Sequence, residues 1–174
     1  NGPKPVMPKI DFSTTPSLLT ALKNPAVNVR SHAAAQLVGK GEGATKQTLA
    51  FLREKEKDAN LRSRAVWVLA QLGKQGRAEV SKYLTAEDEP EKVIVAYRAL
   101  RHADPKGLLA RAHALAESKF PSVRREVAVS LKGTSFFGCR EALIGLIAGY
   151  DGRNRYYLEA LGVAFHGKER EVYE

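Results

Sequence analysis

A repeat of about 31 residues runs along the chain and constrains its fold more than any other feature. One series of leucines recurs at nearly equal steps, at Leu37, Leu69, Leu100, Leu131 and Leu161. A second series recurs with the same period, at Leu22, Leu52, Leu84, Leu115 and Leu146. Two independent series with one period indicate a repeat protein whose units stack and bury a shared core.

Each repeat contains the pattern of two amphipathic helices. In the second repeat the apolar residues follow the spacing i, i+4, i+7, i+8 and i+11, at Leu61, Ala65, Val68, Leu69 and Leu72. This spacing is typical of one apolar stripe on a helix, and no stretch alternates with period two for long enough to suggest a sheet. The aromatic share is 7%, and alanine and leucine supply most of the apolar residues, which favours helix. We therefore predict an all-α fold, an α-α superhelix of about five antiparallel helix pairs.

Prolines and glycines separate the predicted helices. Thr15-Pro16 predicts an N-cap followed by proline in the first turn. Three prolines fall in the links inside pairs, where each ends one helix before the next begins: Pro25, Pro90 and Pro121. Three glycines follow the second helices, where a left-handed cap costs glycine little: Gly39, Gly73 and Gly133. This arrangement predicts an extended segment at 1–14, a repeat domain at 15–167 and the start of a truncated helix at 168–174.

The composition bounds the class of protein. With 174 residues, 44% of them apolar and 27% charged, the chain has the size and balance of one globular domain. No apolar run approaches the roughly 20 residues of a membrane-spanning helix, so we expect no membrane insertion. The single Cys139 excludes an internal disulfide and any multi-cysteine metal or haem site. The chain opens without Met and without a signal peptide, so we expect a mature form or an excised fragment.

Three short motifs open the predicted second helices and carry a family resemblance. They are Asn28-Val29-Arg30, Asn60-Leu61-Arg62 and Ser122-Val123-Arg124. With the leucine spacing, they resemble the short HEAT-like repeat of phycobilisome-lyase-type proteins, over about residues 15–165. The resemblance implies a HEAT-like or armadillo-type solenoid. It also admits a lyase that attaches a pigment to a partner chromoprotein, although the sequence offers no nucleophile for that reaction.

A second resemblance concerns the stretch Tyr150-Asp151-Gly152-Arg153-Asn154-Arg155-Tyr156-Tyr157-Leu158-Glu159-Ala160-Leu161-Gly162. It is similar to the last HEAT unit of large secreted bacterial proteins known as membrane-bound dehydrogenases. In that family a β-propeller precedes the HEAT repeats and a c-type haem domain follows them. This sequence has neither a strand-rich segment nor a Cys-x-x-Cys-His motif. The resemblance therefore implies a spacer domain of a periplasmic or secreted protein, and it assigns no catalytic residue to this chain.

Arginines recur at one position near the start of the second helices, at Arg30, Arg62 and Arg124. They could form a basic stripe that binds phosphates or an acidic partner. They could also form a hydrogen-bond ladder between successive repeats, with Asp58 and Asp151 as acceptors. We favour the ladder, because a stacked repeat reuses its own joints. In the third repeat Lys92 and Val93 replace the aliphatic–arginine pair, so the ladder should be interrupted there.

Further basic and aromatic residues extend the candidate interaction surface. Four arginines are expected to face solvent more freely: Arg64, Arg125, Arg153 and Arg155. Tyr156 and Tyr157 could cap the apolar core or form an aromatic docking surface, and the two interpretations are compatible. The complete candidate surface is Arg30, Arg62, Arg64, Arg124, Arg125, Arg153, Arg155 and Tyr156.

Other motifs do not predict a catalytic, cofactor or metal site. The glycine cluster at 39–43 lacks the Gly-Lys-Ser/Thr ending of a phosphate loop and has no preceding strand, which indicates a turn between repeats. The four histidines form no His-x-x-x-His pair, and the acidic runs show no ligand spacing. Cys139 has no base nearby in sequence and is interpreted as a small core residue.

We therefore predict a non-catalytic HEAT-repeat scaffold or protein-interaction module from a larger secreted oxidoreductase-like protein. Its partner would be another protein or the flanking domains of the same chain, and no cofactor is expected. The alternative is a nucleic-acid-binding HEAT-like domain, because the formal net charge is +9. Against that alternative, the basic residues are spread along the chain and there is a single tryptophan, Trp67.

Overall fold

The computed structural model describes residues 9–86 and 88–173, and in these residues every regular element is helical. The prediction of an all-α protein is confirmed for this part of the chain. The helices form two compact units, residues 9–80 and residues 81–173. Of the predicted N-terminal segment 1–14, residues 1–8 lie outside the described residues, as does residue 174 at the other end.

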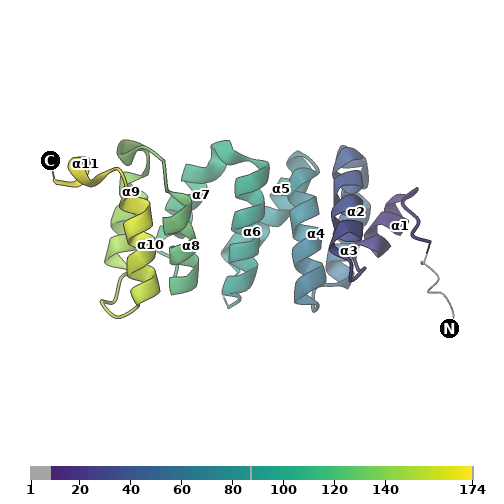
Figure 1. Cartoon of the computed structure of the whole chain (residues 1–174), viewed down its shortest axis with the longest axis horizontal. Coiled ribbons are helices and arrows are strands. Elements are labelled where there is room, and N and C mark those ends of the chain that lie inside the picture. The colour runs from purple at the N-terminus through teal and green to yellow at the C-terminus, as the bar shows by residue number, and fades with distance from the viewer. Residues whose placement is uncertain (1–8, 87, 174) are drawn as a thin grey trace, which may run out of the picture. The chain divides into compact units, whose positions relative to one another are not determined.

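The first unit consists of two helix pairs followed by one further helix. Its helices are α1 (Thr15–Ala21), α2 (Val27–Gly39), α3 (Thr45–Glu54), α4 (Ala59–Gln71) and α5 (Lys74–Ser81), with a 3₁₀ turn at Gly41–Ala44. Within the pairs α1 packs on α2 and α3 packs on α4 (Figure 1). Between the pairs, the first helices α1 and α3 contact each other, and so do the second helices α2 and α4. The two pairs therefore stack with like helix on like helix.

The second unit repeats this arrangement. Its helices are α6 (Pro90–Ala103), α7 (Leu108–Ala116), α8 (Pro121–Ser130), α9 (Phe136–Ala148), α10 (Arg155–Phe165) and α11 (Glu169–Tyr173), with 3₁₀ turns at Lys82–Thr85 and Pro105–Gly107. The helix α7 packs on α8 and on the next first helix, α9. The second helices α6, α8 and α10 contact in that order. The segment predicted as the start of a truncated helix contains α11.

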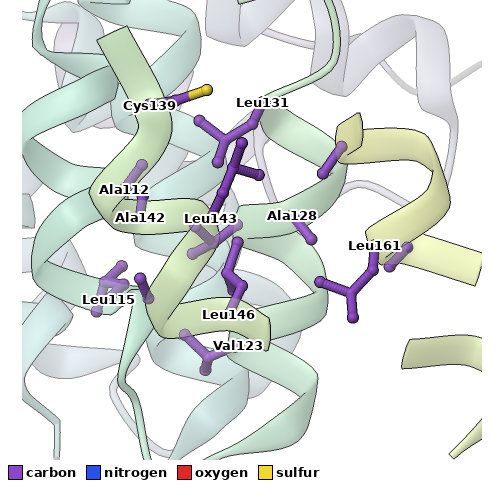
Figure 2. Close-up of a cluster of buried hydrophobic side chains, with 14 of the residues drawn as sticks. Ala112, Leu115, Val123, Ala128, Leu131, Cys139, Ala142, Leu143, Leu146 and Leu161 are labelled. Carbon is purple, nitrogen blue, oxygen red and sulfur yellow. The ribbon is translucent and has the colours of Figure 1, made fainter. Parts of the chain in front are cut away.

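The residues that define the sequence period form the core of each unit. In both leucine series every member is buried except Leu84, which is half-buried against the core of the second unit. Figure 2 shows the result in the second unit, where Leu115 of α7, Val123 of α8 and Leu143 of α9 converge. Each fully buried leucine contributes about 2 kcal/mol from the apolar area removed from water. This packing accounts for the period of the leucine series, because each helix of each repeat contributes one inward-facing leucine to the core.

The helix ends differ from their predicted positions by one or two residues. The N-cap of α1 is Thr14, which forms a capping box with Ser17 and places Pro16 in the first turn. Gly39 is the last residue of α2, and the left-handed conformation falls instead on Gly41, at φ 58°. Gly73 and Gly133 have φ of 94° and 77° and end their helices as predicted. Pro90 and Pro121 are the first residues of α6 and α8, where a missing N–H costs no helical hydrogen bond.

The last pair has a longer link than the others. The N-caps of the second helices follow at nearly equal steps until the last step, which is longer: Ala26, Asp58, Glu89, Phe120 and Asn154. The leucine period groups Leu161 with the leucines that close the second helices, but Leu161 lies one turn earlier in α10. Counted from its N-cap, Tyr157 therefore occupies the place of Leu61 and Val123. The leucine spacing concealed this shift because α10, like the other second helices, has apolar residues four positions apart.

A close approach joins α5 to α4 in the first unit. Gly76 in α5 is buried, and a Cβ atom added there would lie 2.0 Å from the carbonyl oxygen of Leu69. In the same unit the Glu42 carboxylate accepts a hydrogen bond of 3.3 Å from the main-chain N–H of Lys74. The turn after α2 is thereby tied to the start of α5, and the glycine cluster serves as a connection between repeats.

Gly76→Ala should destabilise the protein by about 2 kcal/mol, because α5 must move away from α4 to admit the methyl group. Gly39→Ala is the matched control, since nothing lies within 4 Å of the added Cβ and alanine favours helix. Urea unfolding followed by circular dichroism measures both changes. Equal stability of the two variants would contradict the close packing of α5 on α4.

Candidate interaction surface

The three recurrent arginines share one internal contact. In each, Nη1 donates to the main-chain carbonyl oxygen six residues earlier: Arg30 to Asn24 at 2.9 Å, Arg62 to Glu56 at 2.6 Å, and Arg124 to Ser118 at 2.5 Å. These carbonyls lie just beyond the end of the first helix of each pair. A guanidinium there donates a hydrogen bond to a carbonyl that lacks a helical partner. Its positive charge is also stabilised by the negative end of the helix dipole. The arginines therefore connect the two helices of a pair.

Arg124 makes a larger set of contacts than the other two arginines. Its Nη2 donates to the carbonyl of Gly149 at 2.6 Å, and its Nε donates to the Tyr157 hydroxyl at 3.1 Å. The guanidinium carbon also lies 5.2 Å from the centre of the Tyr157 ring. The Tyr157 hydroxyl in turn donates to the carbonyl of Leu146 at 2.5 Å. Arg124 and Tyr157 thus join α8 to the end of α9 and the start of α10.

The acceptors predicted for the arginine ladder were wrong. Asp58 is the N-cap of α4 and accepts from the main-chain N–H groups of Asn60 and Leu61. Asp151 accepts from the N–H of Arg153, and this hydrogen bond holds the pKa of its carboxyl below the usual value. The arginines donate to main-chain carbonyl oxygens instead. At the equivalent place in α6 the buried Val93 interrupts the series, as the sequence predicts.

Arg64 does not face solvent freely, contrary to expectation. It is half-buried, and its Nη1 donates to the carbonyl oxygen of Leu22, the C-cap of α1, at 2.7 Å. Within the first unit this contact links α4 to the preceding pair. Arg64 thus forms the joint between repeats that the sequence predicted for Arg62. Its lack of counterparts at the same position in other repeats hid this role.

An ion cluster on α6 and α8 was not predicted. Glu126 accepts from Arg98 at 2.5 Å, and its other carboxylate oxygen lies 3.6 Å from Arg101. The hydrogen bond to Glu126 raises the pKa of Arg98. Glu126 lies far from both arginines in sequence, so only the contact between the second helices brings the charges together. The cluster neutralises part of the basic charge on this side of the second unit.

Four residues of the predicted surface remain at the surface of the second unit. Arg125 is half-buried on α8, and Arg153 is exposed in the link before α10. Arg155 is exposed and forms an ion pair with Glu159 one turn later, at 2.9 Å. Tyr156 is 70% exposed, whereas Tyr157 beside it is buried. The two tyrosines therefore divide the predicted roles, with Tyr157 in the core and Tyr156 on the surface.

The described residues offer no cluster suited to metal binding. In residues 9–86 and 88–173 no three His, Cys, Asp or Glu side chains converge. Cys139 is buried, and its Sγ donates to the carbonyl of Ser135 at 3.1 Å. None of the helices in this part of the chain is both long and apolar enough to cross a bilayer.

No protein-family model matches the chain, and no curated protein sequence matches it. Function must therefore be inferred from the residues and their geometry.

Arg124→Ala should lower the free energy of unfolding by about 3 kcal/mol, because two carbonyl groups and the Tyr157 hydroxyl lose a charged donor. Arg124→Lys should recover only part of this loss, since an ammonium cannot reproduce the planar fork. Arg125→Ala is the matched control and should change stability by less than about 0.5 kcal/mol. Denaturant unfolding measures all three, and an equal loss at both arginines would contradict the joint.

Proposed function

We propose that this chain is a HEAT-like α-solenoid that serves as a non-catalytic scaffold or protein-interaction module. The like-on-like stacking of helices inside each unit supports this proposal, because stacked pairs of this kind present extended surfaces for binding. A protein partner or a flanking domain of the same chain is the expected ligand. No catalytic residue or cofactor is assigned.

The main support for the proposal is that the candidate residues fall into two groups, one bonded inside the fold and one exposed on the surface. Arg30, Arg62, Arg64 and Arg124 donate to main-chain carbonyls inside the fold. The exposed side of α10 instead presents Arg155, Tyr156 and Leu158. Large exposed aromatic and aliphatic side chains beside arginine are typical of protein interfaces. We assign binding to this side of α10, with Arg125 and Arg153 nearby in the same unit.

A photo-crosslinking amino acid in place of Tyr156 should form adducts with a protein in an extract of the cells that produce this chain. The same amino acid at the exposed Ala35 of α2 is the control and should form none of these adducts. Leu158→Asp should remove the adducts, because a charge would replace an apolar contact, and Val27→Asp in the first unit should not. Adducts that persist in Leu158→Asp would contradict binding through α10.

Nucleic-acid binding is the second candidate, favoured by the net charge of +9. If it holds, affinity for a DNA duplex should fall steeply with salt, and Arg125→Ala, Arg153→Ala and Arg155→Ala should each reduce the slope by about one. Under the protein-interaction proposal, affinity for DNA should be weak and unchanged by these variants at about 0.15 M salt. The same protein preparation serves both assays, so the two functions are compared directly.

We further propose that this domain is a spacer in a larger secreted bacterial redox protein, on the resemblance of the stretch at 150–162 alone. In that case the gene should encode a β-propeller before this segment and a Cys-x-x-Cys-His haem-attachment motif after it. Reading the complete open reading frame tests this placement. A stop codon just after Glu174 with no such motif would overturn it.

A further inference from the structure

One charged side chain among the described residues is buried without an ion pair. Lys168 lies between α10 and α11 and is 2% exposed. Its ammonium donates to the carbonyl oxygen of Ala164 at 2.6 Å and to that of Leu131 at 3.2 Å. Within the described part of the chain no carboxylate pairs with it. Because removing an ammonium from water is costly, these two carbonyls must compensate the burial.

The turn after α10 does not by itself require this burial. Four of the second helices are followed by a glycine with a positive φ: Gly41, Gly73, Gly133 and Gly167. The residues that come next are the exposed Glu42 and Lys74, the half-buried Thr134 and the buried Lys168. A lysine at this place of the repeat can therefore lie in water, as Lys74 does. The packing around the end of α10, and not the turn, buries Lys168.

The two carbonyls that accept from Lys168 belong to the ends of two neighbouring helices. Ala164 lies in the last turn of α10, and Leu131 is the C-cap of α8. The last carbonyls of a helix lack intrahelical partners and carry the negative end of the helix dipole. The helices α8 and α10 pack on each other, so one ammonium reaches both ends. Helix ends thus stabilise the charge where a carboxylate would be the usual partner.

The segment that follows Lys168 contributes little burial of its own. The helix α11 has five residues, too few to be stable as an isolated helix. Residues 169–172 are all exposed. The preceding Gly167 has a φ of 76°, a conformation in which glycine is unstrained and turns easily. The side chain of Lys168 is therefore the buried anchor of residues 167–173.

We propose that residues 167–173 form a strap that Lys168 latches and that opens while the rest of the second unit stays folded. Solvation of the ammonium favours the open strap, and its hydrogen bonds to two helix ends favour the closed strap. Opening turns the chain at Gly167 and returns the ammonium to water on its flexible stem. It also uncovers the carbonyls of Leu131 and Ala164. This device goes beyond the proposed function, because it controls the ends of α8 and α10 and not the exposed side of α10.

Amide hydrogen exchange in the whole chain, followed residue by residue by NMR, tests the strap. Lys168→Met keeps most of the stem but removes the ammonium, so two carbonyls lose their donor. Exchange at positions 168 and 172, whose N–H groups are hydrogen-bonded in the closed strap, should become at least about tenfold faster. The amides of Leu143 and Leu146 in the core of α9 should change by less than about twofold. Lys74→Met, at the equivalent place after Gly73, is the matched control and should leave positions 168 and 172 unchanged.

Two results of this experiment would overturn the proposal. Equal acceleration of amides throughout the second unit would show that Lys168 acts only on global stability. Unchanged or slower exchange at positions 168 and 172 would show that the ammonium does not hold the strap.

The unaltered chain provides an independent test that does not depend on the folding of a variant. Acetylation by N-hydroxysuccinimidyl acetate should modify Lys168 at least about tenfold more slowly than the exposed Lys74 and Lys132, because the strap must open first. Peptide mass spectrometry measures the rates. Below the unfolding transition, urea should change the rate at Lys168 by less than about twofold, since local opening exposes little surface. A rate that rises with urea as steeply as global unfolding, or one equal to that of Lys132, would contradict a local latch.

Discussion

A single pair of helices this short cannot bury its own apolar side chains, and the rest of the structure depends on that constraint. The pairs here contain helices of 7 to 14 residues. Such helices are marginal alone in water, so packing against neighbours must stabilise them. Each pair therefore needs a neighbour on each side, which produces the regular leucine period and the like-on-like packing within both units.

Part of the basic charge joins helices. Main-chain carbonyls at and just beyond a helix end lack intrahelical hydrogen-bond partners. A guanidinium can donate hydrogen bonds to them. Arg30 and Arg62 do this inside pairs, and Arg64 does it between pairs of the first unit. Arg124 does both in the second unit, through the carbonyls of Ser118 and Gly149. A net charge of +9 is therefore weaker evidence for nucleic-acid binding than its size suggests. Charges already committed to carbonyls would have to leave them to reach phosphates.

The candidate surface could be predicted only in part, and the reason is geometric. Recurrence at one position identified the joint arginines, because a repeated environment selects a repeated residue. Recurrence could not identify the acceptors of these arginines, because every residue has a main-chain carbonyl and the residue type does not show which one accepts. Glu126 illustrates the same limit: its partners Arg98 and Arg101 lie on a different helix, and no sequence spacing links them. Tyr156 and Tyr157 are adjacent in sequence, yet the phase of α10 puts one on the surface and the other in the core.

The sequence alone determined that the chain is helical, where its turns fall to within one or two residues, and that the two leucine series form the core, with Leu84 the half-buried member. These follow from local periodicity, glycine and proline chemistry and burial of apolar area, all of which act over a few turns of chain. Tertiary structure alone decided the role of Arg64, the one-turn shift of Leu161 in α10 and the close approach of Gly76 to Leu69. It also decided that Lys168 reaches the ends of both α8 and α10. Such features depend on how helices that are distant in sequence pack against each other. The spacing of residues along the chain does not specify that packing.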